Sequence, residues 1–154
     1  MNMKNLSRRE FMETGMVLTT GALALMDVRP AFSQMTQPSQ EVYQTLKDPK
    51  IISELEMKHV PLIDAPDRVK KGEAFSLNVR IGRTLHPMEK PHHIEWIHVM
   101  KKGGIPLAEV NLSYEGITPS ATLNLALSES TEIHVKILCN IHGYWMEIKK
   151  IEVV

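Results

Sequence analysis

Residues 75–81 alternate between apolar and polar side chains without a break, and this period of two is the strongest constraint on the fold. Such alternation is typical of a β-strand with one face buried and the other in water. Further strand-like stretches follow, separated by turn residues; they are residues 93–100, 108–114, 121–127, 132–138 and 144–153. The sequence therefore predicts an all-β domain, an immunoglobulin-like antiparallel β-sandwich of about seven strands.

The first 33 residues have the layout of an export signal. Arg8 and Arg9 form a twin-arginine pair, an uncharged run extends from Thr14 to Met26, and residues 31–33 offer small side chains for cleavage. The run is shorter than the about 18 to 20 apolar residues that span a bilayer, which favours a cleaved signal over an uncleaved membrane anchor. We therefore expect a periplasmic or otherwise exported protein without a membrane span after cleavage.

Two further segments follow the signal. Residues 34–53 are expected to form a polar lead-in that contains a short helix between Ser39 and Asp48, and residues 54–154 are expected to form the β-sandwich. The chain carries 18 basic and 18 acidic residues, a balance that gives no indication of a nucleic-acid partner. Cys139 is the only cysteine, so a disulfide framework within the chain is excluded.

Cys139 and His142 lie three positions apart and are followed by a glycine, so one tight turn can present a thiolate and an imidazole together. A buried thiol beside a surface histidine would give the same pattern. Histidines in two other loop-like, proline-marked stretches favour a metal site. His86 and His92 flank the loop between the first two strong strands, and His59 precedes the first of them. Because loops at one end of a sandwich can converge, we expect these stretches to build one site.

The other three histidines are weaker candidates. His93 should point away from the side of His92, and His98 and His134 lie within strand patterns. The five remaining candidates offer four imidazole nitrogens and one thiolate sulfur, more than a tetrahedral zinc site or a trigonal blue-copper site uses. Five-coordinate iron with one open position fits this number, and an open position favours catalysis over storage.

Three motifs together resemble the superoxide reductases, in particular the neelaredoxin type and the catalytic domain of desulfoferrodoxin. They are Lys58-His59-Val60-Pro61, the run from His86-Pro87 to His92 and Ile94, and Cys139-Asn140-Ile141-His142-Gly143. The resemblance covers residues 54–154. It implies a mononuclear non-haem iron, with His59, His86, His92 and His142 as equatorial ligands and Cys139 as the axial ligand.

The resemblance also implies an activity, the one-electron reduction of superoxide to hydrogen peroxide. Lys58 beside the open iron position would attract the anion. The thiolate of Cys139 would push electron density onto the iron, tuned by hydrogen bonds from the backbone N–H groups of Ile141 and His142. The implied partner is an electron donor such as a rubredoxin-like protein or a cytochrome, and a homo-oligomeric state is compatible with the resemblance.

Met57 departs from the family pattern. Many members carry a glutamate directly before the lysine, and that glutamate binds the sixth position of the oxidised iron. A thioether is a poor ligand for ferric iron, so the oxidised site is expected to be open or water-bound. Glu54 and Glu56 are the nearby carboxylates that could take the place of the glutamate.

The main alternative is an exported blue-copper electron carrier. Cys139, His142 and Met146 have the order in which such proteins place ligands on one loop. This interpretation would leave His59 and one member of the His86 and His92 pair without a role. A third alternative is a non-catalytic binding sandwich in which the three motifs coincide by chance.

Overall fold

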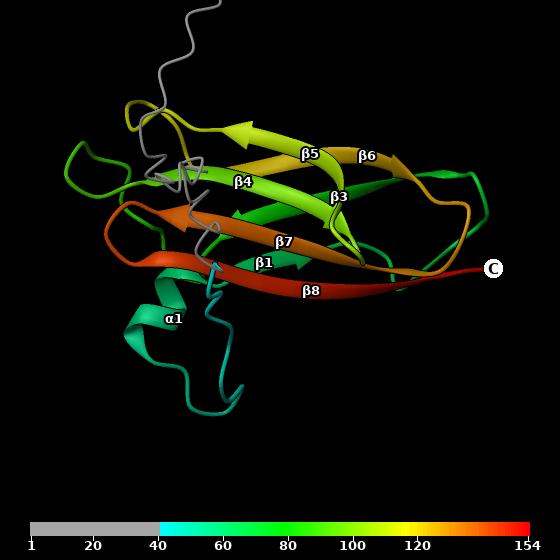
Figure 1. Cartoon of the computed structure of the whole chain (residues 1–154), viewed down its shortest axis with the longest axis horizontal. Coiled ribbons are helices and arrows are strands. Elements are labelled where there is room, and N and C mark those ends of the chain that lie inside the picture. Colours follow the sequence, from blue (N-terminus) through cyan, green and yellow to red (C-terminus); the bar gives the residue numbers. More distant parts are fainter. Residues whose placement is uncertain (1–40) are drawn as a thin grey trace, which may run out of the picture. The chain divides into compact units, whose positions relative to one another are not determined.

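The computed structural model describes residues 41–154, which form two packed β-sheets and one short helix (Figure 1). The predicted export signal, residues 1–33, lies outside the described residues, as do residues 34–40 of the predicted lead-in. Between residues 41 and 154, no helix is long and apolar enough to cross a membrane.

The strands form a three-stranded sheet and a five-stranded sheet. The order in the smaller sheet is β1 (Pro61–Asp64), β3 (Ala74–Ile81) and β6 (Ser120–Ala126). The order in the larger sheet is β2 (Arg68–Val69), β8 (Gly143–Val153), β7 (Thr131–Cys139), β4 (Ile94–Lys101) and β5 (Ile105–Asn111). All pairs are antiparallel except β2 with β8. The prediction of an all-β, two-sheet antiparallel sandwich is therefore confirmed.

Alternating side chains of both sheets meet in the core. On β3, Leu77, Val79 and Ile81 are buried while the polar residues between them are exposed, as the period of two predicts. The larger sheet contributes a second set of buried aliphatic side chains, which are Ile94, Ile97, Val99, Ile133, Val135, Ile137 and Ile151. Burying such a side chain contributes about 1.5–3 kcal/mol, so this interface supplies the main stabilisation of the sandwich.

β5 starts well before its predicted position, and the two short strands β1 and β2 are not predicted from the sequence. β5 begins at Ile105, three residues before the predicted start, because the turn after Lys101 reverses the chain at once and these two residues pair directly. β1 and β2 contain only four and two residues, which is too short for alternation to predict.

The prediction of a short helix between Ser39 and Asp48 is wrong for residues 41–48, the part of that stretch that the structure describes. Gln44 instead pairs with β8: its N–H donates to the carbonyl oxygen of Tyr144 at 3.0 Å, and its own carbonyl accepts from the N–H of Met146 at 2.9 Å. Backbone pairing with the edge of β8 therefore replaces the local helical bonds.

Helix α1 (Glu54–His59) immediately precedes β1. Ser53 is its N-cap: the hydroxyl accepts from the N–H of Glu56 at 3.3 Å, and the carboxylate of Glu56 accepts from the N–H of Ser53 at 2.8 Å. This reciprocal capping box satisfies two backbone donors at the helix start. The Ser-x-x-Glu spacing is thus the sequence signal for a helix that strand alternation cannot detect.

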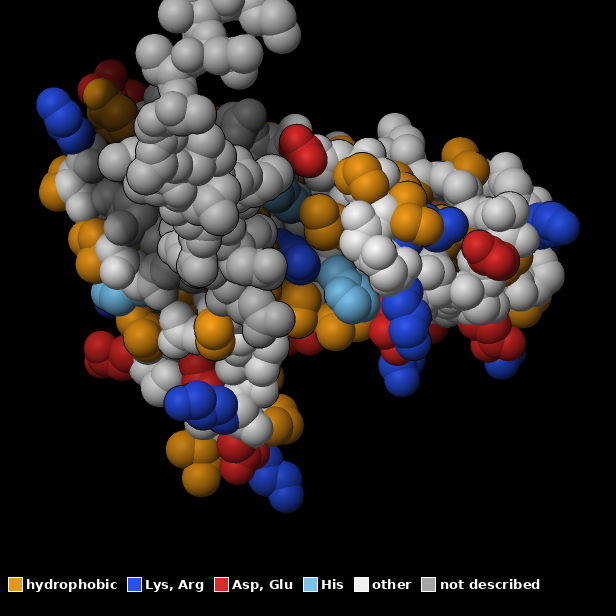
Figure 2. Space-filling model, in the orientation of Figure 1, with side chains coloured by type: hydrophobic (Ala, Val, Ile, Leu, Met, Phe, Trp, Pro, Cys, Tyr) orange, Lys and Arg blue, Asp and Glu red, His pale blue; other side chains and the backbone are white. Residues whose placement is uncertain are grey.

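Charged side chains of both signs are interspersed on the face that Figure 2 presents, in keeping with the neutral composition.

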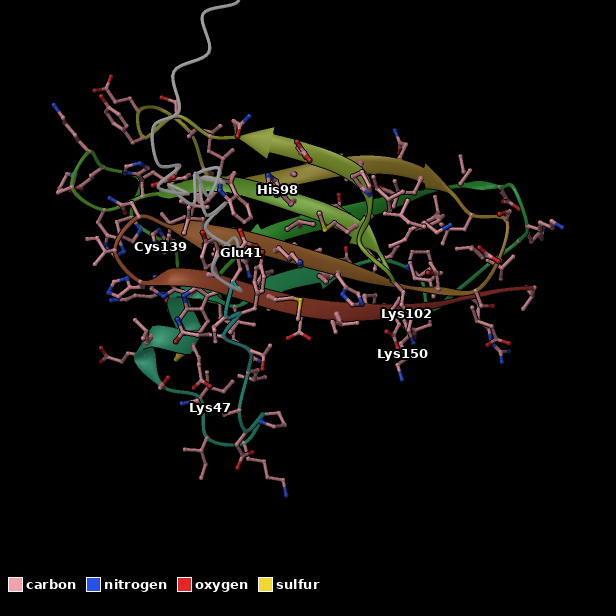
Figure 3. The ribbon with its side chains drawn as sticks, in the orientation of Figure 1. Glu41, Lys47, His98, Lys102, Cys139 and Lys150 are labelled. Carbon is pink, nitrogen blue, oxygen red and sulfur yellow. The ribbon has the colours of Figure 1, made fainter. Side chains whose placement is uncertain are left out.

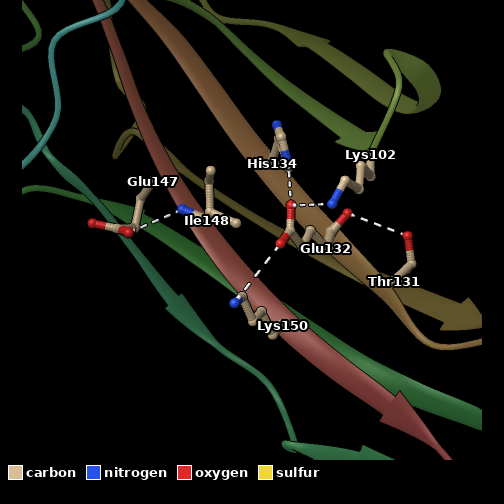
Figure 4. Close-up of polar contacts among 7 residues, drawn as sticks. All are labelled: Lys102, Thr131, Glu132, His134, Glu147, Ile148 and Lys150. Atoms are coloured by element: carbon tan, nitrogen blue, oxygen red, sulfur yellow. Dashed lines mark hydrogen bonds and ion pairs between the residues drawn. The ribbon is translucent and has the colours of Figure 1, made fainter.

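Cys139 lies near one end of the sandwich, and Lys102 and Lys150 lie toward the other (Figure 3). There, Glu132 contacts Lys102 and His134 at 3.5 Å each and Lys150 at 3.9 Å (Figure 4). The hydrogen bond from His134 is the main cause that lowers the pKa of Glu132. We interpret this network as a cross-strand surface contact, far from the candidate ligands.

Candidate metal centre

The last turn of α1 places His59 in the interior. Its ring is fully buried, and Nδ1 lies 2.7 Å from the carbonyl oxygen of Leu55, one turn earlier. A carbonyl oxygen only accepts, so Nδ1 carries the proton and Nε2 keeps a lone pair. The indole of Trp145 stacks on this ring, with 5.1 Å between centroids and 21° between planes. The helix and β8 together fix the direction of the Nε2 lone pair.

His86 repeats this arrangement from the loop after β3. Its ring is buried and its Nδ1 lies 2.6 Å from the carbonyl oxygen of Pro87, so its Nε2 also keeps a lone pair. The Nε2 atoms of His59 and His86 are only 3.1 Å apart. Burial lowers the pKa of both histidines to about 4, so both rings are neutral near pH 7. Two buried lone pairs that face each other repel unless a cation contacts both, and a metal ion is such a cation.

The loop between β3 and β4 is closed so that His92 faces the same point. Glu89 and His92 exchange two backbone hydrogen bonds of 3.1 and 2.9 Å across Lys90 and Pro91. The Nε2 atom of His92 is buried and has no hydrogen-bond partner among the described residues. Buried polar atoms are nearly always paired, so this nitrogen is a free donor atom for a metal.

Asn140 ties this loop to the turn between β7 and β8. Its Oδ1 accepts from the N–H of His93 at 2.9 Å, and its Nδ2 donates to the carbonyl oxygen of Pro91 at 3.2 Å. The same turn places Cys139 at the end of β7 and His142 just before β8. One amide side chain therefore holds two candidate ligand loops side by side.

The four histidine rings form a square. Ring centroids are separated by 4.7 Å from His59 to His86, 4.6 Å from His86 to His92, 4.8 Å from His92 to His142, and 4.6 Å from His142 to His59. Neighbouring rings are inclined at 80°, 74°, 66° and 72° in the same order. Across the square, His59 and His92 are 6.0 Å apart and inclined at 28°. This arrangement suits equatorial coordination of one ion by four imidazoles.

Cys139 adds a sulfur to the histidine square. Its side chain is fully buried, and Sγ lies 3.5 Å from Nδ1 of His142. The candidate ligand atoms of His59, His92, Cys139 and His142 all lie within 4.8 Å of one another, and His86 joins them through its contact with His59. All five predicted ligand residues are therefore brought together.

The expected backbone hydrogen bonds to the sulfur are not formed. Among the described residues, the hydrogen-bond contact of the Cys139 thiol is with the ring of His142, and no backbone N–H donates to it. In the same turn, the backbone N–H of Asn140 donates to the carbonyl oxygen of His93 at 3.1 Å.

One side of the square opens to solvent through a hollow of about 240 Å³, lined by Glu54, Leu55, Lys58, His59, His92 and His142. Cys139 does not line this hollow and is fully buried, so the sulfur is shielded from the side that solvent enters. Lys58 is exposed at the hollow, next to the open side, as the resemblance implies. A larger hollow of about 550 Å³, beside Glu132, contains no histidine or cysteine.

The carboxylates considered for the open position differ in their surroundings. Glu56 is buried in the capping box, where hydrogen bonds, above all from Ser53, lower its pKa to about 2. It also accepts from the N–H of Lys47 at 3.0 Å, so its oxygens are already engaged. Glu54 is exposed and lines the hollow.

The remaining histidines lie away from the square. His93 contacts the carbonyl oxygen of Glu89 at 3.2 Å, His98 stacks on Trp96, and His134 contacts Glu132. Met146 of the copper alternative follows Trp145 on β8, and successive strand side chains point to opposite faces. Because the Trp145 ring stacks on His59, Met146 points away from the site, and the copper alternative is not favoured.

Comparison with known proteins agrees with this geometry. The family model described as Desulfoferrodoxin matches residues 51–148, a range that contains all five candidate ligands and Lys58. The chain belongs to the desulfoferrodoxin family. A candidate superoxide reductase from Thermotoga maritima is 35% identical to this chain over an alignment 114 residues long, and the match covers 62% of this chain and 87% of that protein.

One further relative and one solved structure are also similar to this chain. A desulfoferrodoxin homologue from Archaeoglobus fulgidus is 32% identical over 100 residues, or 65% of this chain and 70% of that protein. Among solved structures, the superoxide reductase (neelaredoxin) from Ignicoccus hospitalis is similar to this desulfoferrodoxin-family chain with a TM-score of 0.58 and 32% identity. The match covers 62% of this chain and 81% of that one.

Proposed function

We propose that this desulfoferrodoxin-family chain is a superoxide reductase that binds one iron ion and reduces superoxide to hydrogen peroxide. The main support for the proposal is the square of four imidazoles with the buried thiol of Cys139 beside it. A hollow opens the square to solvent, and Cys139 does not line that hollow. Four neutral nitrogens and one thiolate form a donor set that suits iron. The similarity to the Ignicoccus hospitalis superoxide reductase supports the same conclusion.

The lone pairs of the imidazole rings in the square are arranged to bind a cation. The facing lone pairs of His59 and His86 and the unpartnered Nε2 of His92 all need a positive charge nearby. Iron held by the ligand set His59, His86, His92, His142 and Cys139 would supply the electron that, with two protons, converts superoxide to hydrogen peroxide. Cys139 would contribute the only negative charge of that set.

Lys58 is the residue that we assign to substrate capture. Lys58 is exposed and lines the hollow through which an anion would reach the square. An ion pair at ~4 Å is worth about 1 kcal/mol in water and roughly 4 kcal/mol at an effective dielectric constant near 20. Because Lys58 is exposed, the lower part of this range applies, and the effect should weaken with salt.

The cellular setting is part of the proposal. The reaction consumes one electron per superoxide, so an external carrier must supply it, and a rubredoxin-like protein or a cytochrome is the expected kind. The twin-arginine pattern at residues 8 and 9 supports export to the periplasm, with residues 1–33 removed and residues 54–154 forming the working domain.

Metal analysis with an absorption spectrum of the oxidised protein tests the function. We expect about one iron per chain, a thiolate-to-iron absorption band, and bleaching of that band on reduction followed by its return when superoxide is added. One copper per chain with an intense copper–thiolate band would support the copper alternative. An iron-loaded protein that does not react with superoxide would overturn the proposed reaction.

A further inference from the structure

We propose that Glu54 is a specificity-determining residue that favours singly charged anions over doubly charged ones at the site. The proposal rests on the proposed function, because it assigns a role in choosing the substrate of that site. It concerns the charge in the hollow and does not require Glu54 to bind the metal.

Glu54 and Lys58 are placed together by α1. They are four residues apart, so they lie on the same face of the helix, with the acidic residue toward the N-terminus. Both line the hollow beside His59, His92 and His142. No ion pair between the two is present among the described residues, so both charges act on the contents of the hollow.

Among the residues that the structure describes, Glu54 is the only carboxylate that lines this hollow. The carboxylate of the neighbouring Glu56 already accepts hydrogen bonds from Ser53 and from the N–H of Lys47. Within residues 41–154, Lys58 is the only lysine or arginine that lines the hollow. The balance between Glu54 and Lys58 therefore sets the protein charge that an entering anion meets before it reaches the histidines.

The negative charge of Glu54 discriminates between anions by their charge. Its repulsion of an anion grows in proportion to the anion's charge, so in free energy it disfavours a doubly charged anion such as sulfate about twice as strongly as a singly charged one at the same place. A bound metal ion and Lys58 would attract both kinds of anion in either oxidation state of the metal, and Glu54 would reduce that attraction most for the doubly charged one. Superoxide carries one negative charge, so Glu54 favours it over more highly charged anions.

The effect of removing Glu54 should scale with ligand charge. The interaction between Glu54 and a bound anion is proportional to the charge of the anion. If Glu54→Gln tightens the binding of a singly charged anion by a given factor, it should tighten the binding of a doubly charged one by about the square of that factor. For an exposed carboxylate at this range we expect about 2- to 4-fold for azide and about 4- to 16-fold for sulfate.

The test uses the iron-loaded, oxidised full chain. Azide affinity is measured by absorption titration, and sulfate affinity by competition with azide at constant ionic strength. The matched control is Glu95→Gln, which removes one exposed carboxylate near the start of β4 but not from the hollow. We expect both affinities to rise in Glu54→Gln, with sulfate rising more, and both to change little in Glu95→Gln.

Three results would overturn the inference. They are unchanged affinities in Glu54→Gln, equal gains for azide and sulfate, and equal effects in the two variants. Equal gains together with a changed absorption spectrum of the anion-free protein would mean that Glu54 binds the iron. Each of these results leaves the proposed function intact, which fails separately if the wild-type protein binds no iron or does not react with superoxide.

Discussion

Gly82 lies directly against the backbone of Lys58. A Cβ atom at position 82 would be 2.4 Å from the carbonyl oxygen of Lys58, and Gly82 has a φ of +77°. The residues that follow Gly82 close the end of α1: the N–H groups of Arg83 and Thr84 donate to the carbonyl oxygen of Met57 at 2.7 and 3.2 Å. This close approach holds the helix that carries Lys58 and His59 against the end of β3.

We predict that Gly82→Ala destabilises the protein by at least about 3 kcal/mol, since the new methyl group meets backbone that cannot move aside. Gly72→Ala is the matched control, because Gly72 has a similar φ of +73° but nothing within 4 Å of its added Cβ. It should cost only the strain of the left-handed conformation, about 1–2 kcal/mol. Urea denaturation measures both values, and equal costs would mean that the contact with Lys58 does not matter.

Lys58→Ala should slow the reaction with superoxide by about tenfold at low salt and should flatten its dependence on ionic strength. The reason is the loss of the positive charge of Lys58, the one lysine that lines the hollow within residues 41–154. Lys90→Ala is the control, because Lys90 is exposed on the loop before His92 but does not line the hollow. Stopped-flow measurements over a series of salt concentrations compare the variants. A wild-type rate and salt slope in Lys58→Ala would remove this residue from substrate capture.

Cys139→Ser should abolish the thiolate-to-iron absorption band and most of the activity while the sandwich still folds. The exchange replaces sulfur by oxygen at a fully buried position and leaves the β7–β8 pairing in place. Absorption and circular dichroism spectra of the iron-loaded variant check this. A band of unchanged intensity in a folded variant would show that the sulfur is not an iron ligand.

Metal-free protein should lose stability as the pH falls from about 6.5 toward 4. His59 and His86 have a pKa of about 4 in the folded state, chiefly because burial disfavours the charged ring, against 6.5 in the unfolded chain. In this window the unfolded chain binds protons that the folded chain does not, so acid favours unfolding. Above pH 6.5 these two groups no longer change the stability.

Denaturation of the metal-free protein between pH 4 and 8 measures this slope. The double variant His59→Gln, His86→Gln should lose most of this slope, whereas His98→Gln should keep it, because His98 stacks on Trp96 away from the square. A metal-free wild-type protein that is equally stable at pH 5 and pH 7.5 would contradict the buried, neutral state of the two rings.

The sequence was sufficient for the fold class because burial on one face of a sheet imposes a period of two. The pattern of residues 75–81 survives unchanged in β3. The periodicity of apolar residues does not predict helix α1, because six residues are too few to show a helical period. The sequence signal for this helix is the capping pair Ser53 and Glu56. The helix expected near residue 44 was wrong because pairing with β8 outweighed local preference.

For the candidate site, too, some features could be predicted from the sequence and others depend on the packing of distant segments. Ligand-type residues in three separate segments could be predicted to meet, because loops at one end of a sandwich converge. One of them, His59, lies in helix α1 and not in a loop. The stacking of Trp145 on His59 and the 3.1 Å contact between two imidazole nitrogens depend on the packing of distant segments. The roles of Gly82 and Asn140 depend on such packing too, and no local pattern encodes them. Glu54 and Glu56 were equal candidates in the sequence, and only the hollow and the capping box distinguish them.

The peroxide yield of the reduced, iron-loaded protein in a single turnover with superoxide tests the central claim most directly. If the square of histidines holds an iron that gives one electron to superoxide, each ferrous ion should yield about one hydrogen peroxide, without release of dioxygen. A yield of about half a peroxide per superoxide with dioxygen released, or no oxidation of the iron, would contradict the account.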